Sequence, residues 1–124
     1  MKSNPNLVLK ALRGANTCNE NSSKSIGNAV NDLICELIKR NDLEPEQIVS
    51  ITFSATRDLD ACFPASIARK HPGLENVALL DCQQMFVKND LANCIRVLAL
   101  AWVPSTQAPQ HPYLGRATRL RPDR

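Results

Sequence analysis

The clearest hydrophobic pattern along the chain is helical. Apolar residues recur at spacings of three and four at Ile26, Ala29, Val30, Leu33, Ile34, Leu37 and Ile38. This period predicts an amphipathic helix with one apolar face. Ser22 or Ser23 suits its first turn as a cap, and Lys39, Arg40 and Asn41 suit its carbonyl end. We expect this face to lie on the core and to carry no catalytic group.

Shorter apolar runs on both sides of this helix are typical of strands. The runs cover residues 7–12, which lead to Arg13 and Gly14, residues 48–53 and residues 77–80. Between the last two, the pattern predicts a short helix over 64–70, with Pro64 in its first turn and Pro72-Gly73 ending it. Residues 91–102 fit a helix or a strand equally well. After a Pro-rich loop over 104–112, residues 113–120 are predicted to form a last strand.

Length and charge limit the classes of protein to consider. The 124 residues suit one domain over 1–124 without an internal linker, and residues 121–124 are expected to be mobile while the site is empty. Fifteen basic and twelve acidic residues give a net charge of only +3. This is too little for a protein that lives on nucleic-acid phosphates, and it favours a small anionic ligand.

The five cysteines are scattered singly, at Cys18, Cys35, Cys62, Cys82 and Cys94. An odd count without a C-x-x-C pair predicts neither a disulfide framework nor a zinc site, and it favours a reducing cytoplasm. We expect all except Cys82 to be buried as small apolar residues. The sequence shows no signal-peptide pattern and no apolar run of about 20 residues that would span a membrane.

One charge stands where the pattern is most apolar. Arg96 lies within Cys94-Ile95-Arg96-Val97, and a guanidinium among apolar neighbours needs an anionic or hydrogen-bonding partner. Common nucleotide-binding, zinc-protease and serine-hydrolase motifs do not occur. His71 and His111 stand beside prolines without an evident acidic partner, so we expect surface roles and no acid–base catalysis from them.

Four blocks of sequence together resemble one family. The blocks are Leu12-Arg13-Gly14-Ala15-Asn16-Thr17, residues 54–65, Cys94-Ile95-Arg96-Val97, and Tyr113-Leu114 with Leu120-Arg121-Pro122-Asp123. In order and spacing they are similar to the monofunctional, trimeric chorismate mutases. The resemblance covers nearly the whole chain, and four matched blocks are far more specific than one motif.

The resemblance implies an α+β fold in which a mixed β-sheet has helices packed outside and three subunits form a pseudo-α/β-barrel. It makes residues 91–102 a strand and puts the active sites between neighbouring subunits. The implied reaction is the pericyclic rearrangement of chorismate to prephenate in phenylalanine and tyrosine biosynthesis. It requires no cofactor, metal, nucleic acid or membrane. A dicarboxylate whose ether oxygen gathers negative charge suits fixed cations, and the reaction needs no nucleophile or base.

The family's motifs also imply roles for residues of this chain. Arg96 is expected to face the ether oxygen and one carboxylate, and Arg13 and the Tyr113 hydroxyl are expected to bind carboxylates. Phe63 and Ala65 would form an apolar wall from the adjoining subunit. The remaining expected contacts lie at the mouth, Arg69, and on the C-terminal segment, Leu120 and Arg121, which would close over the substrate.

Two positions depart from the family pattern. Gln84 stands where the family has a glutamate that contacts the substrate hydroxyl, so it keeps hydrogen-bonding capacity but loses the charge. Asp81 stands where the family often has a small residue such as cysteine in the site wall. We hypothesise that Asp81 supplies the missing carboxylate, although a surface aspartate at a strand end explains it equally well.

Two other functions remain open on the sequence. A non-catalytic or weakly active relative would bind chorismate, prephenate or an aromatic end product as a regulatory module, and Gln84 is its only support. An imine deaminase of a similar trimeric architecture would share a carboxylate-binding arginine. It does not account for the four matched blocks.

Overall fold

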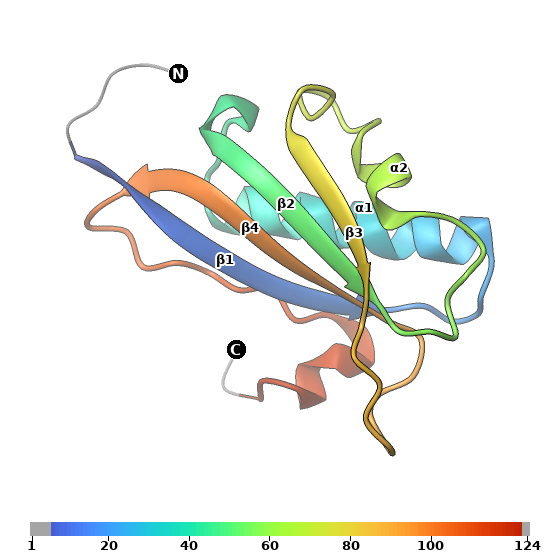
Figure 1. Cartoon of the computed structure of the whole chain (residues 1–124). Coiled ribbons are helices and arrows are strands. Elements are labelled where there is room, and N and C mark those ends of the chain that lie inside the picture. Colours follow the sequence, from blue (N-terminus) through green and yellow to red (C-terminus); the bar gives the residue numbers. More distant parts are fainter. Residues whose placement is uncertain (1–5, 123–124) are drawn as a thin grey trace.

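Four strands form one mixed sheet in the computed structural model, which describes residues 6–122 (Figure 1). The strands are β1 (Leu7–Thr17), β2 (Ile48–Ala55), β3 (Ala78–Gln83) and β4 (Cys94–Pro104). Their order across the sheet is β1-β4-β2-β3, with β4 antiparallel to both neighbours and β2 parallel to β3. The first and last strands of the chain are therefore paired side by side.

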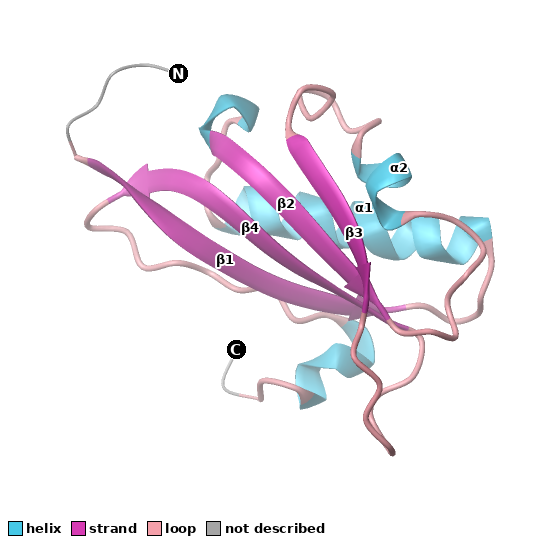
Figure 2. Cartoon of the chain, in the orientation of Figure 1, coloured by secondary structure: helices cyan, strands magenta, loops and turns pink. Residues whose placement is uncertain are grey.

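The helices α1 (Ser23–Arg40) and α2 (Pro64–Ala68) pack on one face of this sheet (Figure 2). Ser22 caps α1 by accepting a hydrogen bond from the Ser25 amide at 3.1 Å. At the other end Asn41 donates to the carbonyls of Leu37 and Gln110, both at 2.9 Å. Short 3₁₀ helices η1 (Pro45–Gln47) and η2 (Gly115–Arg119) complete the fold. The predicted amphipathic helix and its Ser22 cap are confirmed.

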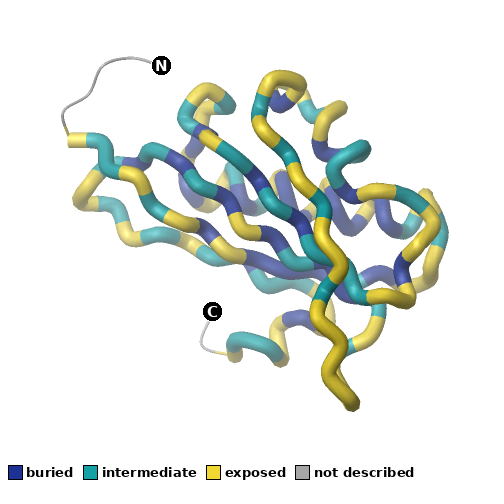
Figure 3. The backbone as a smooth tube through the Cα atoms, viewed as in Figure 1, coloured by how far each residue is buried: buried dark blue, intermediate teal, exposed yellow. Residues whose placement is uncertain are grey.

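Alternation along β4 separates two faces of the sheet. Ile95, Val97 and Ala99 are at most 4% exposed and pack with α1 residues such as Leu33, so we call this side the covered face. The intervening residues point the other way, to the open face, because side chains alternate along a strand. Figure 3 shows buried and less buried segments alternating along the strands.

The open face is apolar along much of its length. Cross-strand register puts Leu9 opposite Trp102, Ala11 opposite Leu100, and Leu98 opposite Thr52, which pairs in turn with Leu80. Leu9, Leu98 and Leu80 are 47%, 46% and 59% exposed. Such a continuous apolar surface is unusual for a chain that works alone and is typical of an assembly interface.

The structure corrects two predicted boundaries. β1 continues through Arg13 and Gly14 to Thr17, so this glycine does not end the strand. A side chain at Gly14 would come within 2.6 Å of the Pro112 carbonyl oxygen, and glycine thus admits the C-terminal segment beside β1. Similarly, β3 includes the polar residues Asp81 and Cys82 that were expected to follow it.

The predicted last strand over 113–120 is wrong. Tyr113 forms a single bridge to Ala15, and the chain then turns into η2. Gly115 makes this turn with a φ of +56°, a conformation that glycine adopts without strain. Ala117 is fully buried by the turn. Of the tail expected to be mobile, residues 123 and 124 lie outside the described residues.

All five cysteines are free, as their spacing predicted. Cys18 and Cys94 are buried, and burial raises the pKa of the Cys18 thiol to about 11. Cys82, which was not predicted to be buried, is exposed. Contrary to prediction, Cys35 is exposed too, because it lies on the solvent side of α1, and Cys62 is only partly buried. Within residues 6–122 no helix is long and apolar enough to cross a membrane.

Candidate active site

The candidate site begins with a row of backbone neighbours across the open face. Arg96 on β4 pairs with Ala15 on β1 and with Ser54 on β2. Ala15 also forms the bridge to Tyr113, so the C-terminal segment extends the row beyond β1. This arrangement brings Arg96 and Tyr113 together although 17 positions separate them in the sequence.

Gln84 joins this row from the end of β3. Its backbone N–H donates to the Ala55 carbonyl at 2.8 Å, and its side-chain Oε1 accepts from the Ser54 hydroxyl at 2.7 Å. Because Oε1 is engaged, the amide offers its Nε2 hydrogens to a ligand. Ser54 was not among the predicted site residues, since only the strand register reveals that it lies beside Arg96.

Arg13 lies on the same face as Arg96, two residues before Ala15 and opposite Leu98. Its backbone N–H donates to Nδ1 of His111 at 2.9 Å. His111 is therefore a structural partner of β1, a more specific role than the surface position expected for it. Its ring nitrogen helps fix the strand segment that carries Arg13.

The C-terminal segment covers one end of the open face. The Leu114 N–H donates to the Ala15 carbonyl at 2.8 Å, and Ala15 donates to Pro112 at 3.0 Å. A small apolar cluster contains Ala15, Cys94 and Ala117, and three partly buried residues pack against it: Leu91, Tyr113 and Leu120. Arg121 follows Leu120 directly. The strand β1 and the C-terminal segment thus contribute to one site region.

Arg96 meets a carboxylate that the sequence analysis did not single out. Its Nη2 lies 3.3 Å from Oδ2 of Asp90, and the two side chains are 32% and 26% exposed. The Arg96 Nε atom is buried and has no hydrogen-bond partner among the described residues. Burial raises the pKa of the neighbouring Cys94 thiol, although Arg96 acts in the opposite direction. The arginine thus keeps unused donor capacity.

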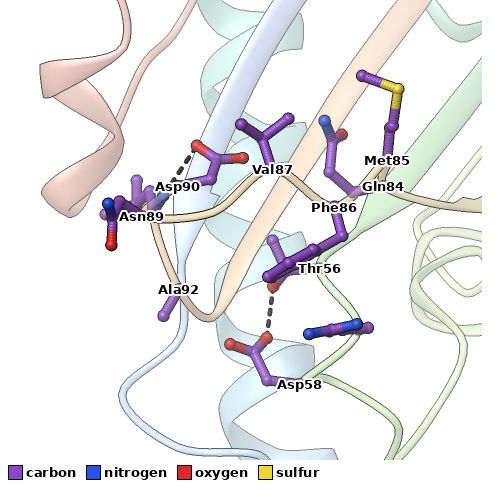
Figure 4. Close-up of a pocket in the computed structure, with 11 residues that line it drawn as sticks. Thr56, Asp58, Gln84, Met85, Phe86, Val87, Asn89, Asp90 and Ala92 are labelled. Atoms are coloured by element: carbon purple, nitrogen blue, oxygen red, sulfur yellow. Dashed lines mark hydrogen bonds between the residues drawn. The ribbon is translucent and has the colours of Figure 1, made fainter.

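Asp90 belongs to the segment that connects β3 and β4. Residues 56–58, 84–87 and 89–92 line a pocket that includes Gln84, Phe86 and Asp90 (Figure 4). The Arg57 guanidinium lies over the Phe86 ring, 3.6 Å from its centroid. Nothing in the spacing of Lys88, Asn89 and Asp90 distinguishes the aspartate from an ordinary turn residue, so its contact with Arg96 depends on the fold.

A second group of predicted residues lies around α2. Phe63, Ala65, Arg69 and Asp81 line a groove of about 360 Å³. Asp81 Oδ1 accepts a hydrogen bond from the Ala65 N–H at 3.0 Å, and burial raises the pKa of this carboxyl. Phe63, in contrast, is 71% exposed. A large aromatic side chain this exposed is well suited to contact another molecule.

The two groups face opposite sides of the sheet. Asp81 pairs with the buried Phe53 and faces α2, whereas its neighbour Cys82 pairs with Ser54 on the open face. One chain therefore gathers Arg13, Gln84, Arg96 and Tyr113 in one place and Phe63, Ala65 and Asp81 in another. The described residues contain no group of three or more His, Cys, Asp or Glu side chains that could hold a metal ion.

Comparisons with known proteins identify the family of this chain. The family model for chorismate mutase type I matches residues 9–124. The chain belongs to this family. It is 36% identical to the chorismate mutase AroH of Thermus thermophilus over 121 residues, which cover 94% of this chain and 96% of the relative. The corresponding protein of Bacillus subtilis (strain 168) is 34% identical over 121 residues, 94% of this chain and 93% of that protein.

The fold of the chorismate mutase family is also shared. A solved chorismate mutase from Clostridium thermocellum superimposes with a TM-score of 0.79 at 35% identity, covering 89% of this chain and 98% of that one. The predicted α+β class and the strand over most of residues 91–102 are confirmed. Membership makes the chain an isomerase of the chorismate mutase class.

Proposed function

We propose that this protein converts chorismate to prephenate at sites shared between neighbouring subunits of a homotrimer. The observation that carries the proposal is the division of the site residues within one chain. Arg13, Gln84, Arg96 and Tyr113 lie by the open face, and Phe63, Ala65 and Asp81 lie by α2 on the other side. Packing one subunit's open face against a neighbour's β3–α2 edge would complete each site.

The apolar open face supports this assembly. Leu9, Leu80 and Leu98 are about half exposed in one chain, and Leu100 and Trp102 extend the same surface. Burying such residues contributes roughly 25 cal/mol for each Å² of apolar area removed from water. We expect the trimer to work in the cytoplasm, where the five free thiols stay reduced.

Catalysis of this rearrangement requires only substrate binding and electrostatic stabilisation. The reaction breaks an ether bond and forms a carbon–carbon bond within one substrate, so no proton or covalent enzyme bond is needed. Arg96 would donate to the ether oxygen as it gains negative charge, where a fixed donor is most effective. Arg13 and Tyr113 would hold carboxylates, and the Nε2 group of Gln84 would donate to the substrate hydroxyl. Together they favour the reactive conformer.

The remaining residues would enclose the substrate. Phe63 and Ala65 of a neighbouring subunit would form the apolar wall, with Arg69 attracting the dianion at the mouth. Leu120 and Arg121 would close the site from the C-terminal segment. Exclusion of water strengthens the electrostatic contacts inside.

The experiment is the loss of chorismate absorbance with the purified protein and with Arg96→Ala under identical conditions. We expect turnover in the wild type and a fall of at least about a hundredfold in kcat/KM, or roughly 3 kcal/mol, in the variant. Size-exclusion chromatography with light scattering gives the oligomeric state in parallel. Chorismate binding without turnover in the wild type would instead favour the regulatory relative.

A further inference from the structure

The segment between β3 and β4 is fixed at its ends and exposed in its middle. Gln84 is bonded to Ala55, and at the other end the Asn93 N–H donates to the Asp58 carboxylate at 3.0 Å. Between them Met85, Phe86 and Val87 are 75%, 58% and 51% exposed. The middle of this segment therefore depends on a few contacts with the body of the protein.

Two of these contacts are made by arginines. Arg57 lies over the Phe86 ring, and Arg96 contacts Asp90. Arg57 has no proposed contact with the substrate, whereas Arg96 is the residue proposed to act on the reacting ether. The position of Asp90 is thus coupled directly to the state of the catalytic group.

The Asp90 carboxylate is held in place by its own turn. The Asp90 N–H donates to the Val87 carbonyl at 3.0 Å, and the Leu91 N–H donates to Asp90 Oδ1 at 2.8 Å, the latter drawn in Figure 4. Asn89 adopts a φ of +69°, which asparagine tolerates better than most residues. This geometry presents the carboxylate to Arg96.

We propose that Asp90 is an internal anion that occupies Arg96 in the empty enzyme and is displaced by a substrate carboxylate, so that it sets substrate affinity. The proposal rests on the proposed function, since it takes chorismate as the incoming dianion. Two carboxylates at one guanidinium repel each other, and a partly exposed ion pair is weak enough to exchange. The Arg96 Nε atom, which has no hydrogen-bond partner among residues 6–122, shows that the contact with Asp90 does not use all the donors of the guanidinium.

The distance between Asp90 and Arg96 also explains why this contact must break before the reaction. A carboxylate within 3.3 Å of Arg96 offsets the positive charge that the developing oxyanion needs. If Asp90 stayed in contact, it would weaken the arginine in the transition state. Displacement therefore lowers apparent affinity while leaving the rate of the bound complex nearly unchanged.

The test compares the wild type with Asp90→Asn in the intact protein. Asparagine has the same shape and can still accept from the Leu91 N–H, so the turn should form. We expect KM for chorismate to fall about two- to fivefold with kcat within about twofold, the range that corresponds to a partly exposed ion pair. The control is Asp32→Asn, which removes an equal charge from an exposed position on α1 and should change neither constant.

Measuring KM at low and high salt distinguishes displacement of Asp90 from long-range electrostatic steering. Steering between separated charges is screened as ionic strength rises, so a fall in KM that persists at about 0.5 M salt supports a direct contact. A fall in kcat with unchanged KM would show that Asp90 positions Arg96, and equal constants would show that it does nothing; either result overturns the proposal.

The proposed function is tested separately, by chorismate turnover and binding in the wild type. If the wild type binds chorismate without converting it, calorimetry gives the Kd of chorismate for the wild type and for Asp90→Asn in place of KM. A lower Kd for Asp90→Asn still supports the displacement. A wild type that neither converts nor binds chorismate would overturn both proposals.

Discussion

Ile95, Val97 and Ala99 point from β4 toward the helices, whereas Arg96, Leu98 and Leu100 point from the same strand to the open face. The first set is fully packed within one chain, and the second is left partly exposed. A shift of one residue along the strand thus moves a side chain from the core of the subunit to a surface suited to assembly and catalysis. Substitutions on the two faces should fail in different ways.

The largest effect should come from breaking the proposed interface without touching the site arginines. Leu9→Glu introduces a charge opposite Trp102, four residues before Arg13 on β1. Burying that charge between subunits is unfavourable, so we expect folded monomers with almost no turnover. Light scattering and chorismate absorbance measure both. Asn31→Glu, on the exposed side of α1, is the matched control, and an active Leu9→Glu trimer would contradict the interface.

The covered face should respond in stability and not in chemistry. Leu33→Ala removes a fully buried side chain from α1 and should lower the free energy of unfolding by about 2–5 kcal/mol. Because Leu33 packs against the covered face and not the open face, kcat should stay the same at temperatures where the variant is folded. Urea denaturation and initial rates test this. A loss of kcat in the folded variant would mean that the faces are less independent than their packing indicates.

Gln84→Glu sharpens the comparison within the open face. A charged hydrogen bond contributes about 1 kcal/mol more than a neutral one, so we expect turnover to rise by several-fold to about tenfold. If Asp81 supplies the missing carboxylate, Asp81→Asn should lower turnover. If turnover is unchanged in Asp81→Asn and rises in Gln84→Glu, Asp81 does not compensate. The wild-type site is then less active than one with glutamate at position 84.

The smallest effect concerns Asp81 on the covered side. Burial raises the pKa of this carboxyl in the folded state, so the fold disfavours its ionised form. Stability is therefore lost as pH rises from the unfolded pKa, about 3.9, through the higher folded pKa. Because the carboxyl is only partly buried, Asp81→Asn should raise Tm by only about 1 °C at pH 7. Thermal unfolding at pH 7 and pH 3.5 should show this difference closing at the lower pH.

Local patterns were sufficient for α1, its Ser22 cap, and the cores of β2 and β3. They were insufficient where a distant segment decides the conformation. Gly14 continues a strand because Pro112 packs against it, and residues 115–119 form η2 because Ala117 is buried beside Ala15 and Cys94. Neither contact has a signal within its own stretch of sequence.

The same limit applies to the candidate site. Arg96 was conspicuous because charge is rare in an apolar run, and the family motifs supplied Arg13 and Tyr113. Ser54 and Asp90 are ordinary polar residues in ordinary positions, and they gain meaning only from strand register and loop geometry. The roles of all the site residues stay predictions until variants are measured.

The pairing of the first strand with the last has a consequence for how the chain folds. Among the strands of the described residues, β1 hydrogen-bonds to β4 alone. Asn6, just before β1, is bonded to Ser105, and Ala15 within β1 is bonded to Pro112. Such distant partners raise the contact order, which slows folding. On the ribosome, residues 7–17 must wait until almost the whole chain has emerged. During that interval the apolar edge of β1 has no partner, so nascent chains should need protection from aggregation more than the finished subunit does.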